Sequence, residues 1–592
     1  MKASFDRRLR FLSVIVILFA LILIAKLYLV QIVSGATFKA KADHQYVEGA
    51  NFFDRGSIYF TAKDGTLVPA ASIQTGYILA IDPEIFAQNA ADVKSIYQKL
   101  NAVTPLGSSL FTQKASKTTD PYEELAQKLP IDTANKIQAL SIPGVSVYSQ
   151  QWRIYPGGSM AAHIIGFEGY GDSSTTDNEL AGRYGLERYY EPVLARNADD
   201  TFVNFFAEIF SDVKKSITPG QSLEGDIVTT IEPSVESYLE EQLQSVQDQY
   251  HSEFTGGIII DPNTGEIYAM GLNPTFDPND PQAQASSAVF TNNSVEDRYE
   301  MGSIVKALTM ASGIDSGAVT ATSTYNDPGC ITVDKKTFCN YDNQSHGRNL
   351  PMQIILDMSL NTGAAYVEQQ MGNATFSKYM FNFGLGSTTG IDLPNEGNSL
   401  VSHLVNGDDL EYEEASFGQG IAITPIQVAR AFSALANGGY LITPHLVKEI
   451  DYNIGTKKII NPGKGAQVIS TQTSHTISRM LTEVVDVALM NGAVKLQNYS
   501  IAAKTGTAQI ANPQGGYYTN HYVHSFFGYF PSYNPRFLIF LYTYYPKNVQ
   551  YASETLTPSF MNLAKFLINY YNIPPDRTAP PPPTVLCPNN DC

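Results

Sequence analysis

The chain has 592 residues, more than one hydrophobic core usually serves, so we expect two or more domains. Hydrophobic residues make up 43% of the chain, as in ordinary globular proteins, and the net charge is -18 with no basic patch or nucleic-acid motif to offset it. Nucleic acid is therefore not expected as a partner. The four cysteines and nine histidines show no spacing typical of a metal site, so the sequence predicts no metal and no cofactor.

The N-terminal segment has the pattern of a membrane anchor. Residues 11–33 are apolar except for four positions, which is long enough to span a bilayer. Basic residues in the stretch 1–10 precede this run, and the positive-inside rule then places the N-terminus in the cytoplasm and everything after residue 34 outside the cell membrane. The alternative is a cleaved signal peptide, favoured by the small residues 34–36 but disfavoured by the length of the apolar run.

Residues 34–225 alternate strand-like runs with polar helices and indicate an extended, non-catalytic module. We expect a strand at residues 76–81 and a helix at residues 91–100. His163 is interpreted as a structural hydrogen-bonding residue. The charged stretch 197–215 is either a helix or a flexible insertion.

Residues 226–572 indicate a second folding unit. Helical patterns separate distant strand patterns, and inserting helices between strands of one antiparallel sheet predicts the α+β class. The proline-rich tail, 573–592, is predicted to be disordered. The expected strands are 226–231, 501–510, 523–530, 537–545 and a hairpin of 257–260 with 266–270, and the expected helices include 234–249, several between 303 and 435, the last of them 425–437, and 559–571.

Residues 298–311 have the pattern of a glycine-led entry into a buried helix. Ser303 and Lys306 are three positions apart, so on a helix they share one face, and a buried lysine can take the proton of a serine hydroxyl. If Ser303 opens the helix, its backbone N–H is unpaired and can bind a developing oxyanion. Because Ser211 and Lys214 have the same spacing, this pair alone is weak evidence of a nucleophile.

Two later stretches supply partners for this pair. Ser359 and Asn361 follow the apolar run 352–358, and Lys504 opens a Lys-Thr-Gly-Thr stretch in a strand of small residues. A second serine can relay protons, an asparagine amide can hold a peptide bond, and a strand lysine offers positive charge to a carboxylate. Gly506 leaves the strand edge open to an extended peptide. The ordered triple predicts a serine acyl-transfer site.

Over residues 2 to about 572 the chain resembles the class B penicillin-binding proteins, which are membrane-anchored peptidoglycan D,D-transpeptidases. It differs from them at Met301, where the family usually has proline, and in the length of the stretch 197–215. The resemblance rests on the three motifs and on residues 55–58, 153–156, 185–187, 261–265, 416–420, 504–509 and 524–531. It implies a cytoplasmic tail (1–10), a transmembrane helix (11–33), an elongated pedestal domain of the dimerisation type (34–225), a transpeptidase domain with a serine β-lactamase-like sheet (226–572) and a disordered tail (573–592).

The resemblance implies that the D-alanyl-D-alanine end of a stem pentapeptide acylates Ser303, with release of D-alanine and transfer to an acceptor amine on a neighbouring stem. β-Lactams would inhibit by acylating the same serine. The implied roles are base for Lys306, proton relay for Ser359, donor-peptide clamp for Asn361, substrate-carboxylate binding for Lys504, Thr505, Gly506 and Thr507, and an oxyanion hole of the backbone N–H groups of Ser303 and Thr507.

Partners follow from what the chain lacks. It has no second catalytic domain to polymerise glycan strands, and class B relatives work beside a SEDS-family glycosyltransferase among divisome or elongasome membrane proteins. Tyr299, Glu300 and residues 525–528 favour the septal over the elongation type by analogy. A D,D-carboxypeptidase stays open, because water and an amine compete for one acyl-enzyme. A secreted β-lactamase is disfavoured for want of a glutamate assignable to deacylation, and a non-enzymatic β-lactam sensor because only about ten residues precede the single span.

Cys330 and Cys339 are separated by a strand-like stretch with a turn at residues 334–336. A hairpin would place the two cysteines opposite each other, and outside the cytoplasm such a pair can oxidise. The alternative is two free thiols. Cys587 and Cys592 lie on the tail, where no comparable geometric argument applies.

Overall fold

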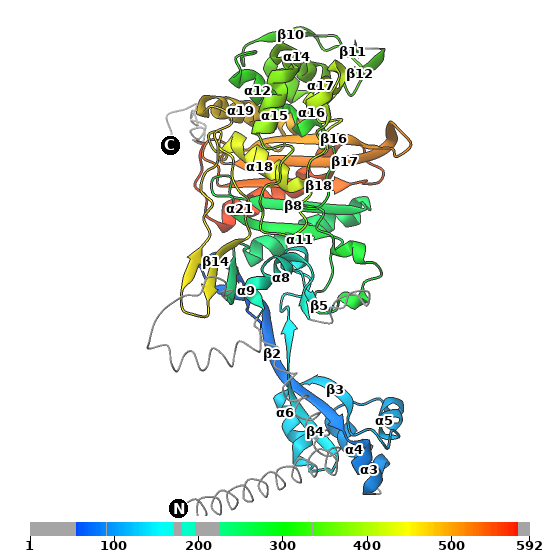
Figure 1. The fold of residues 1–592 in the computed structure, drawn as a ribbon. Helices are drawn as coiled ribbons and strands as arrows, with labels where there is room; N and C mark the ends of the chain where they lie inside the picture. Colours follow the sequence, from blue (N-terminus) through cyan, green and yellow to red (C-terminus); the bar gives the residue numbers. More distant parts are fainter. Residues whose placement is uncertain (1–54, 90, 171–179, 196–223, 334, 578–592) are drawn as a thin grey trace, which may run out of the picture. The chain divides into compact units, whose positions relative to one another are not determined.

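The computed structural model describes residues 55–89, 91–170, 180–195, 224–333 and 335–577, which fall into two compact units (Figure 1). Among these residues, the smaller unit contains Arg55 and residues 73–154, and the larger contains the rest. The sequence led us to expect one boundary at residue 225. The units alternate along the chain instead, because β1 (Ile58–Thr61) pairs in parallel with β7 (Gly225–Thr229) and so joins residues on both sides of that boundary.

Several expectations concern residues outside the described part of the chain. These are the cytoplasmic tail 1–10, the membrane helix 11–33, the stretch 197–215 and the end of the tail, 578–592. Within the described residues, no helix combines the length and the apolar character needed to cross a bilayer.

The smaller unit is a β-sheet covered by helices. Its core is formed by aliphatic and aromatic residues such as Leu79, Phe86, Leu100 and Phe111, all buried. The predicted strand 76–81 is the C-terminal part of a longer strand, β2, and the predicted helix 91–100 corresponds to α4, which begins at Val93. The side chain of Asp92 caps this helix by accepting from the N–H of Ser95. Its elements are residues 73–81 of β2 (Leu67–Ile81), α3 (Pro83–Gln88), α4 (Val93–Val103), α5 (Ser108–Ala115), β3 (Glu123–Leu129), α6 (Ile131–Ala139) and β4 (Val145–Ile154), with β3 and β4 both paired to β2.

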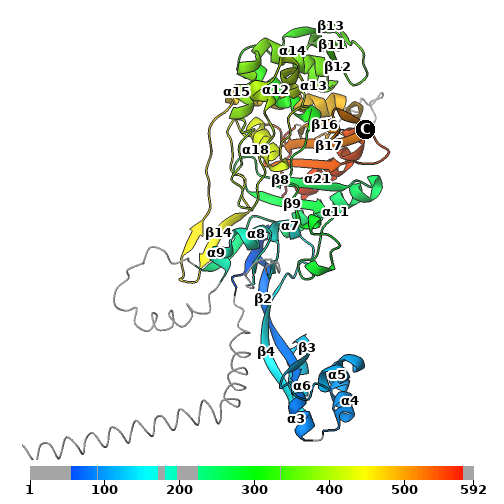
Figure 2. The same ribbon diagram turned by 45° about the vertical axis from the view of Figure 1, so that its right-hand side comes forward.

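The larger unit is organised around a five-stranded antiparallel sheet in the order β16-β17-β18-β8-β9 (Figures 1 and 2). Its outer strands come from distant parts of the sequence, which confirms the α+β prediction. The strands are β8 (Phe254–Ile260), β9 (Ile267–Asn273), β16 (Ala502–Ala511), β17 (Tyr517–Phe530) and β18 (Phe537–Tyr544), close to the predicted ranges except that β17 starts earlier than residue 523.

Alternation along β18 creates two hydrophobic cores. Leu538 and Phe540 point to the face covered by α12 (Lys306–Asp315) and α18 (Pro425–Ala436). Ile539 and Leu541 point to the other face, covered by α11 (Pro233–Tyr250) and α21 (Thr557–Tyr570). Because successive strand side chains alternate between faces, a central strand buried on both sides must be apolar throughout. Figure 2 shows both helical layers.

The main helices have readable start signals. Thr424 caps α18 in a capping box with Gln427, and Pro425 stands at its first turn, where a missing N–H costs nothing. The predictions of 234–249 and 425–437 as helices are confirmed by α11 and α18. The remaining helices of the larger unit are α7 (Ala162–Ile165), α8 (Gly185–Tyr189), α9 (Glu191–Leu194), α13 (Met352–Asp357), α14 (Asn361–Met371), α15 (Asn373–Asn382), α16 (His403–Asn406), α17 (Asp409–Ser416), α19 (Thr471–Glu483) and α20 (Ala552–Thr555).

Short strands and turns complete the unit. The hairpin predicted around residues 261–265 is present, with Gly265 at φ +86° where an L-residue would be strained. The short elements are β5 (Glu168–Gly169), β6 (Ala181–Gly182), β10 (Thr324–Asp327), β11 (Cys330–Val333), β12 (Lys336–Cys339), β13 (Gly347–Pro351), β14 (Val447–Tyr452), β15 (Lys457–Ile459), the 3-10 turns η2 (Pro281–Ala283), η3 (Ser287–Phe290), η4 (Gly302–Ile304) and η6 (Leu489–Gly492), and a π-helical turn η5 (Val484–Ala488).

Candidate active site

The candidate nucleophile lies on a 3-10 turn, and this corrects the expectation that Ser303 opens an α-helix. Gly302 has φ +61°, a left-handed conformation that cannot belong to a right-handed α-helix, and the chain passes through η4 before α12 begins at Lys306. The spacing of three still brings the side chains together, since Ser303 Oγ and Lys306 Nζ lie 2.9 Å apart. They are within hydrogen-bond distance.

The Ser-x-Asn motif occupies the turn between α13 and α14. Ser359 has φ +54°, which is uncommon for a residue with a side chain, and its carbonyl O and Oγ lie 2.6 and 3.2 Å from Lys306 Nζ. Asn361 is the first residue of α14, and its Oδ1 accepts a hydrogen bond from Lys306 Nζ at 2.7 Å. The amine of Lys306 therefore contacts Ser303 of its own motif and both Ser359 and Asn361 of the Ser-x-Asn motif.

The third motif completes the cluster from β16. Lys504 Nζ lies 3.1 Å from Ser359 Oγ and 3.2 Å from the carbonyl O of Thr505. The hydroxyl of Ser359 thus lies between two amines, one from α12 and one from β16. Three stretches separated by up to 200 residues in sequence converge on one point, as the ordered triple predicts.

The pKa values of both lysines are lowered. Burial lowers the pKa of Lys306 well below its usual value, and the nearby Lys504 cation lowers it further. Burial lowers the pKa of Lys504 to about 8, opposed by the Asp357 carboxylate. The lowered pKa of Lys306 favours the neutral amine, which can accept a proton, whereas at neutral pH most of Lys504 keeps its charge. Shifted pKa values of this kind are typical of acid–base sites.

Gly506 is required by packing. A Cβ on Gly506 would lie 2.5 Å from the carbonyl O of Met301 and 2.4 Å from Ser525 Oγ, so the missing side chain makes room for the nucleophile turn. Thr505 and Thr507 flank it on β16, the edge strand of the five-stranded sheet. The pairing of an extended peptide with this edge stays a prediction.

The loop of residues 416–420 lies against the nucleophile turn, and residue-level reasoning gave it no role. Gly302 N–H donates to the carbonyl O of Gly418 at 3.1 Å, and a Cβ on Gly418 would lie 2.2 Å from the carbonyl O of Gly302. Thr309 Oγ1 donates to the carbonyl O of Ser416 at 2.7 Å. The two closely spaced glycines were the only sequence signal of this contact.

Among the described residues, no histidine side chain forms a hydrogen bond with the cluster. His163 Nε2 lies 2.8 Å from the carbonyl O of Val289, and burial lowers its pKa to about 4, as expected of a structural histidine. His524 stands opposite Thr507 in the sheet, but its ring nitrogens contact Thr555 Oγ1 and the carbonyl O of Gln550, and burial lowers its pKa to about 4. Within the described ranges no group of three or more His, Cys, Asp or Glu residues is arranged to hold a metal ion.

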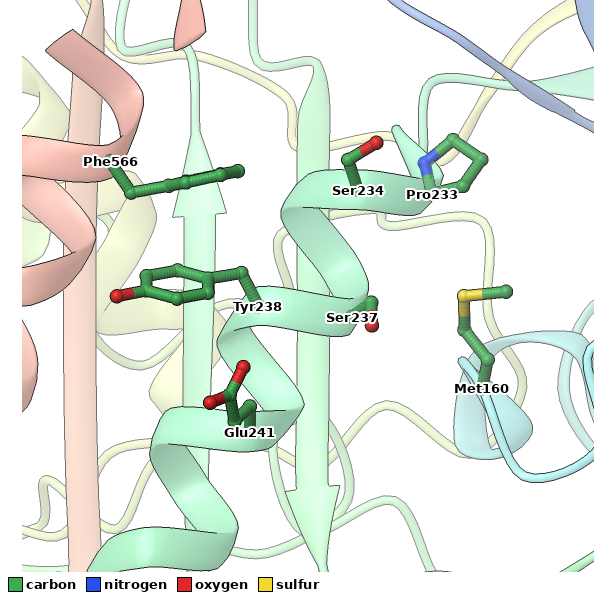
Figure 3. A pocket seen from close by; sticks show the side chains of 7 residues that line it. All are labelled: Met160, Pro233, Ser234, Ser237, Tyr238, Glu241 and Phe566. Carbon is green, nitrogen blue, oxygen red and sulfur yellow. The ribbon is translucent and has the colours of Figure 1, made fainter. Parts of the chain in front are cut away.

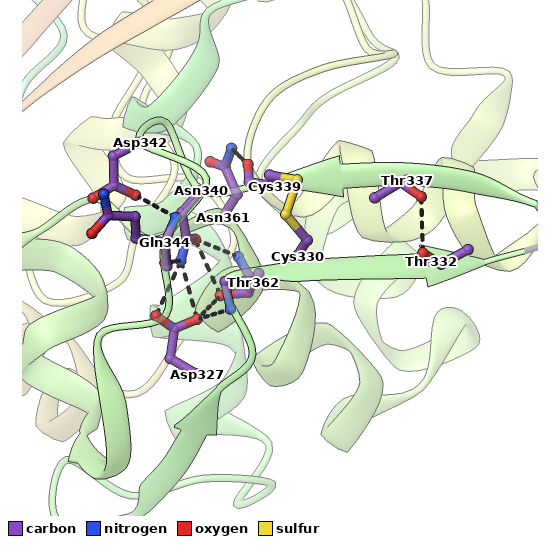
Figure 4. Close-up of a disulfide and its surroundings, with 11 residues drawn as sticks. Asp327, Cys330, Thr332, Thr337, Cys339, Asn340, Asp342, Gln344, Asn361 and Thr362 are labelled. Carbon is purple, nitrogen blue, oxygen red and sulfur yellow. Dashed lines mark hydrogen bonds between the residues drawn. A yellow bond between two sulfur atoms is a disulfide. The ribbon is translucent and has the colours of Figure 1, made fainter.

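A disulfide joins Cys330 and Cys339 beside the cluster (Figure 4). The two residues stand opposite each other in the antiparallel pair β11 and β12, as a hairpin was expected to place them. The main-chain carbonyl of Cys339 contacts the side chain of Asn361. The disulfide therefore lies next to a residue of the candidate site.

A separate cavity of about 460 Å³ lies on α11 and α21 (Figure 3). Tyr238 and Phe566 stack in its wall with ring centroids 4.4 Å apart, and Glu241 lines it as well. No residue of the candidate active site lines this cavity.

Comparison with known proteins identifies the family. Residues 255–564 match the model described as the penicillin-binding protein transpeptidase domain, and residues 51–205 match that of the penicillin-binding protein dimerisation domain. The chain belongs to the penicillin-binding protein transpeptidase family. It is a transpeptidase enzyme of the class B type, and the resemblance inferred from the sequence is confirmed.

Curated relatives span most of the chain. Stage V sporulation protein D of Bacillus subtilis is 29% identical over 570 residues, covering 94% of this chain and 85% of the relative. Penicillin-binding protein PbpB of Mycolicibacterium smegmatis is 29% identical, covering 83% and 76%. Peptidoglycan D,D-transpeptidase FtsI of Escherichia coli K12 is 26% identical, covering 76% and 73%.

Solved structures share the fold. Penicillin-binding protein 2X of Streptococcus thermophilus superposes with a TM-score of 0.71 at 20% identity, covering 87% of this chain and 79% of that one. Penicillin-binding protein 3 of Mycobacterium tuberculosis, in complex with ampicillin, superposes with a TM-score of 0.62 at 26% identity, covering 74% and 93%. These likenesses support the predicted combination of a dimerisation and a transpeptidase domain.

Proposed function

We propose that this class B penicillin-binding protein cross-links peptidoglycan stem peptides through an acyl-enzyme on Ser303. The observation that carries the proposal is the buried amine of Lys306, which lies 2.9 Å from Ser303 Oγ and contacts both residues of the Ser-x-Asn motif. A neutral lysine at hydrogen-bond distance from a serine hydroxyl is a general base in position.

The proposed acylation uses these contacts. Ser303 Oγ bonds to the carbonyl carbon of the penultimate D-alanine as its proton passes to Lys306 Nζ, and the peptide bond to the terminal D-alanine breaks. Ser359 Oγ, which contacts both lysines, carries the proton to the departing amine. An acceptor amine attacks the ester in the second half-reaction, and its proton returns Ser303 to the hydroxyl form.

Binding roles are assigned to the groups around this path. Asn361 clamps the donor peptide, and the positive charge of Lys504, with the hydroxyls of Thr505 and Thr507, binds the terminal carboxylate. The backbone N–H groups of Ser303 and Thr507 form the oxyanion hole. Support for that last role comes from Gly302, where a Cβ would lie only 2.6 Å from the carbonyl O of Thr507, so the two backbones adjoin.

Penicillin labelling tests the nucleophile. A fluorescent penicillin should form a stable covalent adduct with the purified protein, and Ser303→Ala should abolish it because no acyl ester can form. The matched control is Ser211→Ala, which has the same Ser-x-x-Lys spacing and should label normally. Labelling of the Ser303→Ala protein would refute the assignment.

The choice of acceptor needs a second assay. A donor thioester of the stem type is turned over with and without a D-amino acid, and transpeptidation predicts that the amine captures the acyl group as a new amide. A D,D-carboxypeptidase would release only the hydrolysed product at every amine concentration.

We further propose a septal role, with an elongation-type enzyme as the alternative. Tyr299, Glu300 and residues 525–528 support it by analogy, and a relative named FtsI is 26% identical. Depletion in the source bacterium should give filaments without septa. Rounded cells would indicate the elongation role.

The membrane anchor and the partners are also proposed. We place residues 11–33 in the cell membrane as a single span with the N-terminus in the cytoplasm, and a SEDS-family glycosyltransferase beside it among the divisome membrane proteins. The support is the apolar run itself and the absence, in the whole sequence, of a motif for glycan polymerisation.

A further inference from the structure

The amide of Asn361 is held by a main-chain carbonyl outside the three motifs. Figure 4 shows Asn361 beside Cys339, and Asn361 Nδ2 donates to the carbonyl O of Cys339 at 2.8 Å. Asn361 Oδ1 accepts from Lys306 Nζ at 2.7 Å. A carbonyl oxygen can only accept hydrogen bonds, so the group facing it must be the NH₂ end of the amide. The Cys339 carbonyl therefore decides which end of the Asn361 amide faces Lys306.

That choice controls the direction of the Lys306 lone pair. A neutral amine has two hydrogens and one lone pair, and the carbonyl O of Ser359 and Oδ1 of Asn361 are two acceptors, 2.6 and 2.7 Å away, that take the two hydrogens. The lone pair is left for the hydroxyl of Ser303 at 2.9 Å, with Ser359 Oγ farther away at 3.2 Å. A reversed Asn361 amide would present a donor and draw the lone pair away from Ser303.

A buried carboxylate holds the Cys339 carbonyl in place. Asp327 is 4% exposed, and two of the residues that it binds flank the disulfide, with Gly329 next to Cys330 and Asn340 next to Cys339. The donors to its carboxylate are the N–H of Gly329 at 3.0 Å, Nδ2 of Asn340 at 3.1 Å, the N–H of His346 at 2.7 Å and Oγ1 of Thr362 at 2.6 Å.

The same carboxylate is tied to α14. Thr362 follows Asn361, and its N–H donates to Oδ1 of Asn340 at 3.2 Å while its hydroxyl binds Asp327. Asp327 thus holds the base of the disulfide hairpin against the first turn of α14. The disulfide also closes the base of the hairpin, since Cys330 and Cys339 are directly opposite each other at the end away from the turn.

We propose that Asp327 and the Cys330–Cys339 disulfide are positioning groups for acylation, because together they hold the Cys339 carbonyl on the Asn361 amide and so direct the lone pair of Lys306 at Ser303. The inference rests on the proposed function of Ser303. One hydrogen of the Asn361 NH₂ is used by Cys339, and the second remains for the donor peptide.

The pH profile separates this role from general stabilisation. Acylation needs neutral Lys306, so its rate rises with pH through the pKa of that lysine; the charged groups facing it are Lys504 on β16 and, beyond Lys504, Asp357 on α13. Losing the Oδ1 acceptor disfavours the ammonium form, which moves the midpoint of the profile to lower pH while the plateau falls. A protein that is only less stable loses labelling amplitude at every pH and keeps its midpoint.

The experiment uses Asp327→Asn, which keeps the shape but turns one acceptor into an NH₂ group facing the donors of His346 and Asn340. Acylation by fluorescent penicillin is followed by stopped flow across pH at saturating ligand. We expect the plateau rate constant to fall about tenfold, part of the ~10² to 10⁴ contributed by a positioned base, with the midpoint shifted to lower pH. Asp342→Asn is the matched control, because among the described residues Asp342 contacts Gln344 N–H and His346 Nε2 in the same loop but makes no hydrogen bond to the residues that link Asp327 to Asn361, and it should behave as wild type.

A second variant keeps the test decisive if Asp327→Asn does not fold. The double substitution Cys330→Ser with Cys339→Ser retains Asp327 and the main-chain carbonyl but opens the hairpin, and it should shift the profile in the same direction with a smaller fall. Wild-type plateau and midpoint in the folded variants would overturn the proposal. Penicillin labelling of Ser303→Ala would instead overturn the proposed nucleophile, so the two failures are distinguishable.

Discussion

Two lysines, Lys306 and Lys504, approach the hydroxyl of Ser359, and burial lowers the pKa of both. The Lys504 cation is one cause of the lowered pKa of Lys306, after burial. Lys504→Met removes that charge, so the pKa of Lys306 rises and the pH midpoint of acylation should move to higher pH. This midpoint is measured by stopped-flow acylation over a pH series, and substitution of an exposed lysine, Lys464→Met, is the control. An unchanged midpoint would show that the charge of Lys504 does not affect the pKa of the base.

Removal of the base itself gives a larger effect. Lys306→Ala leaves Ser303 without the proton acceptor at 2.9 Å, and the acylation rate should fall by ~10² to 10⁴. Thermal unfolding is measured in parallel, because truncating a side chain that is 1% exposed also changes packing. Wild-type acylation by a folded Lys306→Ala protein would assign the base elsewhere.

At the scale of elements, the disulfide hairpin of β11 and β12 makes a prediction about stability. Closing a ring of about ten residues stabilises by about 2 to 3 kcal/mol in the loop-entropy model. Non-reduced peptide mapping of protein secreted into an oxidising compartment should show Cys330 linked to Cys339, and reduction should lower the melting temperature. Two alkylated thiols in such material would leave the pair as free cysteines.

The contact between the loop of residues 416–420 and η4 leads to a second prediction at this scale. Gly418→Ala would push a Cβ to 2.2 Å from the carbonyl O of Gly302, so the nucleophile turn must move and penicillin labelling should fall with stability. Gly455→Ala is matched to it, since Gly455 also has positive φ (+79°, against +86°) but open space around its Cβ. It should cost only about 1 kcal/mol of backbone strain and label normally. Equal labelling by the two variants would contradict the role of this contact.

At the scale of the whole molecule, the proposed partner can be tested through the anchor. Replacing residues 11–33 with an unrelated apolar helix of equal length keeps a tether but removes a specific helix face. If the span packs against the SEDS-family glycosyltransferase, co-purification and glycan polymerisation by that partner should fall, while penicillin labelling stays at the wild-type level. Unchanged co-purification and polymerisation, also after substitution of the pedestal, would mean that the segment is only a tether.

Local sequence was sufficient for most of the elements and for the choice of candidate site residues. Capped helices such as α11 and α18 and the strands β16 and β18 carry their patterns within 8 to 18 residues, because hydrophobic period and cap chemistry act between near neighbours. The three motifs named Ser303, Lys306, Ser359, Asn361 and Lys504, since each motif is short and its spacing is set by one turn or strand.

Tertiary structure alone decided how these pieces meet. Pairing of β1 with β7 interleaves the two units, and Gly418 and Gly506 make room for the nucleophile turn. Asp327 binds the side chain of Asn340, whose neighbour Cys339 accepts a hydrogen bond from Asn361 at its main-chain carbonyl. These contacts join residues that are distant in sequence or face each other only after a turn. No local pattern encodes them, because hydrogen bonds and close backbone approach depend on where the whole chain places each group.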